Sequence, residues 1–174
     1  MWKNVVILLV VSIYFSSCKN DSKFLNQVKN NEIEYVAEVI PKFHLKVETD
    51  TLLSNNFRVK IKYNSLNKRV LKITETPFII NKSFYREFES VLEVFDGNEI
   101  IFNKKLTKHD FQGPSNNKFW EKAILQFVEI DQLATQQNEK VVLAFLFFNP
   151  ETQNKKLYNL YIDKKGNPET KLVV

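Results

Sequence analysis

The chain has few of the residues on which most small catalytic and redox sites are built. Its 174 residues include one cysteine and three glycines, and its two histidines, His44 and His109, are far apart in the sequence. A single cysteine cannot form an internal disulfide. A zinc site needs three or four His, Cys or carboxylate ligands, and glycine-rich loops that bind phosphate need more glycine. We therefore expect no metal ion and no cofactor.

The chain also lacks an apolar segment long enough to span a bilayer. The apolar stretch Val5 to Phe15 has 11 residues, which as a helix would be roughly 17 Å long. The hydrocarbon core of a bilayer is about 30 Å thick and requires about 20 residues. Lys3 precedes the stretch and the small residues Ser16 and Ser17 follow it. This order is typical of a secretory signal that a peptidase removes.

The one cysteine, Cys18, comes directly after these small residues. The stretch resembles the lipobox of bacterial lipoprotein precursors, with Phe15 where an aliphatic residue is usual and Ser17 where Gly or Ala is usual. The resemblance implies cleavage between Ser17 and Cys18 and a diacylglycerol on the cysteine sulfur. Two or more acyl chains hold a protein on a membrane, since each buried methylene contributes about 0.8 kcal/mol. The alternative is an incidental cysteine behind an ordinary secretory signal.

Three segments follow from this interpretation. Residues 1–17 are the signal peptide, 18–42 the lipidated N-terminus and tether, and 43–174 a single β-rich domain. The net charge of +5 is mild for this length, and dense Lys/Arg blocks of the kind that bind phosphate are lacking. We expect a location in the cell envelope, on the outer membrane facing the periplasm or the cell surface, and no nucleic-acid partner.

Alternating apolar and polar residues predict strands over most of the domain. The alternation covers 43–50 and 57–63, and a turn at 64–68 is expected before a strand at 70–74. The tripeptide Asp96-Gly97-Asn98 predicts a hairpin because Gly and Asn tolerate positive φ. It would join strands at 87–95 and 99–106.

The rest of the domain predicts one helix and three more strands. Trp120, Ala123, Ile124 and Phe127 recur at helical spacing within 113–127. The apolar run 141–148 suits a central strand, and further strands are expected at 157–163 and 170–174. The segment before Pro41 is expected to add a short helix or an edge strand. The fold class is α+β, mostly β: an antiparallel sheet or two-layer β-sandwich of about seven strands with one packed helix.

Two charged groups are candidate functional residues. Glu87, Glu89 and Glu93 recur with period two, so we expect them on one face of a strand, where carboxylates can act as general acid and base. The cations Arg58, Lys60 and Lys62 form a row that is a candidate for binding an acidic polysaccharide or an anionic lipid surface. The alternative for the carboxylates is a solvated face that opposes lysines of a neighbouring strand. The alternative for the cations is a charged edge that discourages aggregation.

Residues Cys18 to Val174 resemble small Bacteroidetes lipoproteins of unknown function in the order of lipobox, polar tether and β-rich body. The sequence favours a non-enzymatic, lipid-anchored binding or assembly module with an envelope protein or glycan as partner. One alternative is a glycan hydrolase that uses a carboxylate pair such as Glu89 and Glu93. Another is a carrier of an apolar ligand in a Phe-rich core.

Overall fold

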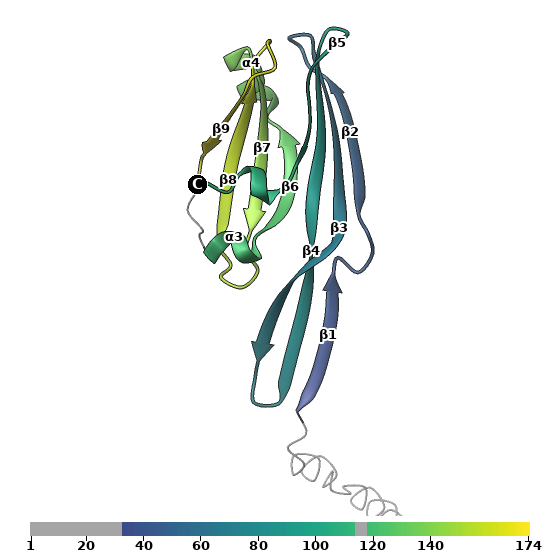
Figure 1. Ribbon diagram of the computed structural model, residues 1–174, viewed down its shortest axis with the longest axis vertical. Coiled ribbons are helices and arrows are strands. Elements are labelled where there is room, and N and C mark those ends of the chain that lie inside the picture. Colours follow the sequence, from purple (N-terminus) through teal and green to yellow (C-terminus); the bar gives the residue numbers. More distant parts are fainter. Residues whose placement is uncertain (1–32, 114–117) are drawn as a thin grey trace, which may run out of the picture. The chain divides into compact units, whose positions relative to one another are not determined.

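The computed structural model describes residues 33–113 and 118–174, and one compact unit spans Tyr35–Val174. Its strands form two sheets that face each other as a two-layer β-sandwich (Figure 1), which confirms the predicted fold class. Nine strands lie in the described residues, two more than expected. Sheet A contains β1 (Glu34–Ile40), β2 (Lys46–Leu52), β3 (Phe57–Glu75), β4 (Ile79–Asp96) and β5 (Glu99–Leu106). Sheet B contains β6 (Ile124–Ile130), β7 (Val141–Phe148), β8 (Lys155–Ile162) and β9 (Pro168–Leu172).

Sheet A is organised around the long hairpin of β3 and β4. The strand order is β1-β4-β3-β2, and β5 also pairs with β4. The predicted hairpin at Asp96–Asn98 is confirmed, since it joins β4 to β5 with Gly97 at a φ of 59°. The predicted turn at 64–68 is wrong: β3 runs through it with a register irregularity between Ser65 and Arg69. The segment before Pro41 forms the edge strand β1, one of its two predicted possibilities.

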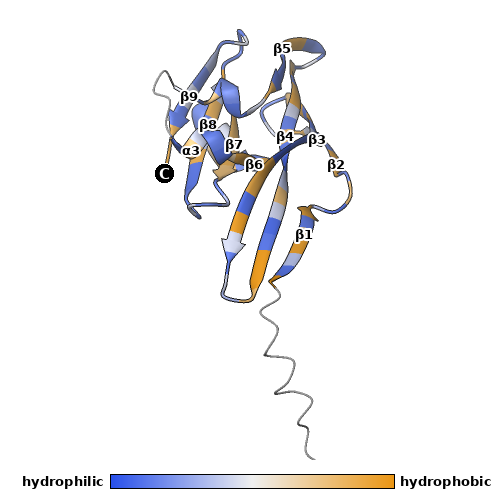
Figure 2. Ribbon diagram, turned by 60° about the horizontal axis from the view of Figure 1, so that its bottom comes forward, coloured by the Kyte–Doolittle hydropathy of each residue, from blue (hydrophilic) through white to orange (hydrophobic). Residues whose placement is uncertain are grey.

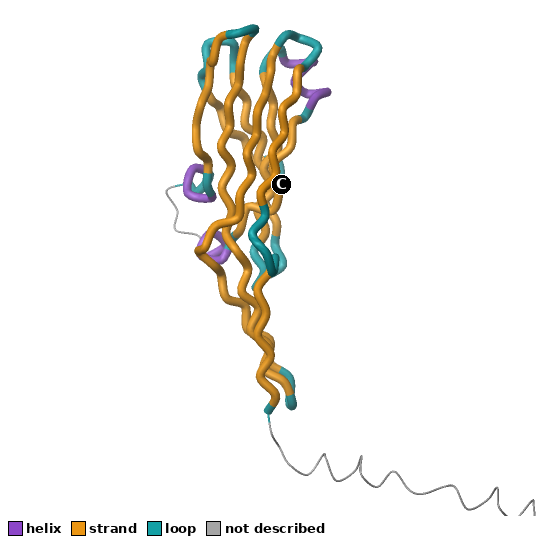
Figure 3. The backbone as a smooth tube through the Cα atoms, turned by 90° about the vertical axis from the view of Figure 1, so that its right-hand side faces the viewer, coloured by secondary structure: helices purple, strands orange, loops and turns teal. Residues whose placement is uncertain are grey.

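Beyond this irregularity, β3 and β4 continue together as an arm. We use this name for residues 35–42 and 69–86, which comprise most of β1, the connection after it, and the parts of β3 and β4 between Arg69 and Arg86. Strand β2 pairs with β3 only from Arg58 to Asn64, so the arm lies outside the four-strand part of the sheet. Figure 3 shows its strands continuing past those of the sandwich.

Sheet B has the order β6-β7-β8-β9, with the predicted apolar strand β7 in the interior of the sheet. Its first five residues, Val141 to Phe145, are all buried. Because β7 has buried residues on both of its faces, other elements must pack against both faces of the strand. Sheet A covers one face, while the helix α4 (Gln132–Asn138) lies against β7, where Thr135 Oγ1 accepts a 2.9 Å hydrogen bond from the Val142 N–H.

The predicted helix within 113–127 is largely wrong. The helix α3 covers Lys118–Lys122, and Ile124 begins strand β6. Ile124 and Leu125 are both buried, and the register of β6 with β7 shifts between Leu125 and Phe127. Two consecutive buried residues followed by a bulge leave the apolar residues of this segment three and four positions apart. A helix would show the same spacing. The beginning of the predicted segment includes 114–117, which lie outside the described residues.

The core between the sheets is aromatic. Phe57, Phe145 and Phe147 are completely buried, and Phe111 packs with its ring centroid 4.7 Å from that of Phe145 and 4.9 Å from that of Phe147. The buried cluster extends from Leu53 to Ile162. A chain that starts at Lys19 therefore retains the whole described core.

Tyr63 links the two sheets at the bulge of β6. Its hydroxyl lies 2.8 Å from the carbonyl oxygen of Leu125 and 2.9 Å from that of Gln126 and donates to them. Burial raises the pKa of this hydroxyl, so it remains a donor. We expect Tyr63→Phe to lower the free energy of unfolding by about 1–2 kcal/mol, because two carbonyls lose a donor. Urea unfolding measures the change, and the exposed Tyr35→Phe is the control. Equal stability of the two variants would contradict this role.

Candidate functional site

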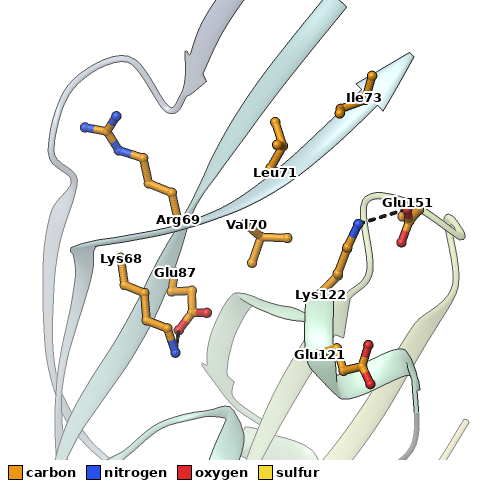
Figure 4. Close-up of a pocket in the computed structure, with 9 residues that line it drawn as sticks. All are labelled: Lys68, Arg69, Val70, Leu71, Ile73, Glu87, Glu121, Lys122 and Glu151. Atoms are coloured by element: carbon orange, nitrogen blue, oxygen red, sulfur yellow. Dashed lines mark hydrogen bonds and ion pairs between the residues drawn. The ribbon is translucent and has the colours of Figure 1, made fainter. Parts of the chain in front are cut away.

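A cleft of about 360 Å³ lies between the base of the arm and the lower end of sheet B. Strand β3 forms one wall with Val70, Leu71 and Ile73, and the helix α3 and the β7–β8 turn form the other. Figure 4 shows the Val70 side chain directed towards α3, with Lys122 and Glu151 across from it. Val70 is buried, whereas Ile73 is exposed. Val70 thus supplies a buried apolar contact at the cleft, and Leu71 and Ile73 supply more exposed ones from the opposite side of the strand (Figure 4).

The charges around the cleft are balanced. Three cations and three carboxylates line it: Lys68, Arg69, Lys122, Glu87, Glu121 and Glu151. Lys122 Nζ lies 2.9 Å from Glu151 Oε1, and Lys68 Nζ lies 3.5 Å from Glu87 Oε2. A balanced rim of this kind does not select a strongly charged ligand.

Strand β3 contributes a backbone edge to this wall. Between Arg69 and Glu75 it pairs with β4 on one side, and the described residues supply no strand on its other side. We call these seven residues the open edge. Unpaired N–H and C=O groups along a strand are a template for the backbone of another chain.

A buried ion pair lies behind the cleft and connects α3 to sheet A. Lys108 Nζ lies 2.9 Å from Glu87 Oε1 and donates to the carbonyl oxygens of Ala123, at 3.1 Å, and Glu121, at 3.4 Å. The side chains of Lys108 and Glu87 are 7% and 9% exposed. The ammonium group has three acceptors for its three protons, and these contacts connect α3 and the residue after it to sheet A.

The cationic row lies on strand β3 as predicted, but acidic partners accompany it. Arg58 binds Asp50 through two hydrogen bonds of 2.7 and 2.6 Å. These hydrogen bonds from Arg58 lower the pKa of Asp50. Lys60 is the cross-strand neighbour of both Asp50 and Glu93. Lys62 is the cross-strand neighbour of Glu48, whose pKa a hydrogen bond from Lys46 lowers. These partners compensate the row, which weakens its case as a site for anions.

The three carboxylates do not act as one group. Glu87 is buried against Lys108, opposite the irregular part of β3, where strand β4 has no regular partner. Glu89 Oε2 lies 3.5 Å from the Nζ of Lys105 on β5. Glu93 lines a hollow beside Lys60 and Lys62. Glu87 is buried whereas Glu89 and Glu93 are partly exposed, and each of the three has a cationic neighbour.

Arg86 is a second buried cation, besides Lys108, that sequence reasoning missed. Arg86 is 6% exposed, donates from Nε to the Pro41 carbonyl at 3.1 Å, and its Nη1 lies 3.0 Å from His44 Nε2. The other ring nitrogen of His44 lies 3.2 Å from Ser65 Oγ. This chain of contacts holds the β1–β2 connection on the arm. The sequence feature that could have indicated this buried arginine is its position between Tyr85 and Glu87 within a strand. His109 is exposed.

The residues of the predicted lipobox, including Ser17 and Cys18, lie outside the described residues. Within the described residues, no helix has the length and apolar character needed to cross a membrane. Residues 33–113 and 118–174 also contain no group of three or more His, Cys, Asp or Glu side chains placed to hold a metal ion.

Comparisons with known proteins supply no functional assignment for this chain. Neither a scan against protein-family models nor a search of curated proteins finds a match to this chain.

Proposed function

We propose that the chain is a lipid-anchored protein of the cell envelope that binds an extended segment of a partner polypeptide along the open edge of β3. The observation that carries the binding role is the open edge itself, because β3 continues beyond β2 and forms a wall of the cleft. The anchor rests on the sequence Ser17-Cys18 behind a short apolar stretch. Lipid on Cys18 would place the molecule on the outer membrane.

The chemistry of the cleft suits a polypeptide. A strand that adds to an open edge gains main-chain hydrogen bonds, while pockets beside the edge select alternate side chains. Here Val70, Leu71 and Ile73 supply apolar contacts, and the opposite wall supplies Lys122 and Glu151. Balanced charges favour a mixed sequence over an acidic glycan or a nucleic acid.

The geometry gives less support to the hydrolase alternative. A glycosidase pair requires two carboxyl groups about 5–9.5 Å apart across a cleft. Glu89 is paired with Lys105, and Glu93 faces Lys60 across the strand. Of the carboxylates that line the cleft, Glu87 is paired with two lysines and Glu151 with Lys122.

Site-specific photocrosslinking in intact cells tests the binding role. A photoreactive residue at Leu71, on the open edge, or at Glu121, on the opposite wall, is expected to give one discrete product with the same partner. The control position is Lys165, in the β8–β9 turn. Mass spectrometry of the product is expected to locate the crosslink in one extended segment of that partner. Equal products from all three positions, or no product from Leu71 and Glu121, would contradict the proposal.

A further inference from the structure

The end of the arm carries a group of large apolar side chains in contact with water. Tyr35 and Phe78 are 68% and 65% exposed. Ile73 and Ile79 are exposed beside them, and all four belong to the tip of the β3–β4 hairpin or the start of β1. Figure 2 shows the hydrophobic colouring at this end of the hairpin. Monomeric proteins rarely leave such a group uncovered.

Contacts within the arm bring these residues to one end. Glu38 on β1 accepts a hydrogen bond from Ser83, and Pro41 accepts one from Arg86, so β1 and β4 run in the same direction (Figure 1). Tyr35 therefore lies near the start of β4, with its ring centroid 6.0 Å from Lys82 Nζ. Lys82 is the cross-strand neighbour of Ile73.

Two cations, Lys72 and Lys82, lie near the apolar group. The other cations of the arm, Lys42, Arg69 and Arg86, lie at its base, and Glu75 lies at the tip, so the excess of three positive charges over residues 35–42 and 69–86 belongs mostly to the base. Aromatic residues combined with lysines are typical of segments that lie in the interface of a bilayer. Lysines near an anionic leaflet add an electrostatic attraction.

The course of the chain indicates which surface this end meets. Tyr35 is the first residue of the compact unit, and 16 residues separate it from Cys18. At most about 3.6 Å per residue, that segment spans no more than roughly 60 Å. A lipid on Cys18 thus keeps the membrane within reach of Tyr35, the same end of the arm that exposes Phe78.

We infer that the end of the arm inserts into the headgroup region of an anionic lipid surface, with Tyr35, Phe78 and Ile79 in the interface and Lys72 and Lys82 at the headgroups. The inference rests on the proposed anchor, since the anchor supplies the membrane. This contact would orient the sandwich and hold the cleft at a fixed height above the lipid.

Vesicle binding by a chain that starts at Lys19 tests the contact without the lipid anchor. The probe is phosphatidylglycerol–phosphatidylethanolamine vesicles, in a sedimentation assay at low salt. Phe78→Asp is expected to weaken binding at least tenfold, since an apolar anchor is replaced by an acid. Lys72→Glu with Lys82→Glu is expected to weaken it by a similar factor and to reduce its salt dependence.

Leu133→Asp is the matched control, because Leu133 on α4 is as exposed as Phe78. It should bind vesicles like the parent chain, and both variants should keep the parent's thermal midpoint. Phe78→Trp should show a blue shift of its emission on vesicle addition, whereas Leu133→Trp should not. An absence of vesicle binding, or equal binding by Phe78→Asp and Leu133→Asp, would overturn the inference. So would a parent chain that dimerises through the arm and loses the dimer in Phe78→Asp.

Failure of the arm to bind membranes can be distinguished from failure of the proposed lipid anchor. The chain from Lys19 lacks Cys18, so its vesicle binding reports only on the arm. The mass of the native N-terminus reports only on the anchor. A lipid on Cys18 together with an arm that does not bind vesicles would remove this inference and leave the anchor intact.

Discussion

Replacing Lys108 by alanine is expected to lower the free energy of unfolding by about 3–5 kcal/mol. The substitution removes the ammonium group that pairs with Glu87 at 2.9 Å and leaves the Ala123 and Glu121 carbonyls without their donor. The carboxylate of Glu87 would keep only the exposed Lys68, at 3.5 Å. For a chain of this size the loss corresponds to a thermal midpoint lower by roughly 10 °C.

Lys104→Ala is the control for this prediction. Lys104 also pairs with a carboxylate, Asp110 at 2.8 Å, but its side chain is exposed. Exposed pairs contribute about 0–1 kcal/mol, so the control should unfold close to the parent. The double variant Lys108→Met with Glu87→Met should recover part of the loss, because it removes both buried charges. A Lys108→Ala variant as stable as Lys104→Ala would show that the buried pair does not hold α3 on sheet A.

Gly166→Ala is expected to lower the free energy of unfolding by about 3 kcal/mol. Gly166 lies in the β8–β9 turn at a φ of 79°, and a Cβ there would come within 1.9 Å of the Ile101 carbonyl oxygen on β5. The left-handed backbone costs about 1–2 kcal/mol for alanine. The clash with backbone forces the turn away from β5 and adds about 1–3 kcal/mol.

Gly113→Ala provides the comparison. A Cβ at Gly113 meets no atom within 4 Å, and its φ is not positive. This variant should be as stable as the parent or slightly more stable, because alanine reduces the conformational entropy of the unfolded chain. Denaturant unfolding of both variants measures the difference. Equal stabilities would contradict the close approach of the β8–β9 turn to β5.

Sequence patterns predicted the strands of the sandwich well where one face is buried and the other is wet. Phe57, Val59 and Ile61 alternate with Arg58, Lys60 and Lys62, and the structure buries the first set. The same patterns failed at β6, where two consecutive buried residues and a bulge interrupt the alternation. The helix α4 was missed although Asp131 caps it by accepting a hydrogen bond from the Ala134 N–H at 2.8 Å.

The candidate site could not be predicted because it depends on packing between distant segments. Val70 and Lys122 line one cleft although about 50 positions separate them. The open edge exists because β2 ends its pairing at Asn64 while β3 continues, a difference in strand length that no local pattern specifies. The predicted turn at 64–68 concealed this edge by dividing one strand into two.

The exposed end of the arm also could not be predicted from the sequence. Phe78 and Ile79 follow Pro77 and resemble the start of any buried strand. Their exposure follows from the length of the β3–β4 hairpin, which carries its tip beyond the residues of sheet B that would cover it. The proposed peptide-binding edge and the proposed membrane contact both lie in the part of the hairpin that the sandwich leaves uncovered.

Intact mass spectrometry of the chain purified from its native membranes tests the central claim most directly. We expect a polypeptide that starts at Cys18 and carries the mass of a diacylglycerol, with or without a further acyl chain. A Cys18→Ser variant is expected to lack that mass and to leave the membrane fraction in high salt. A native chain that begins at Met1, or at Cys18 with an unmodified thiol, would contradict the proposed lipid anchor.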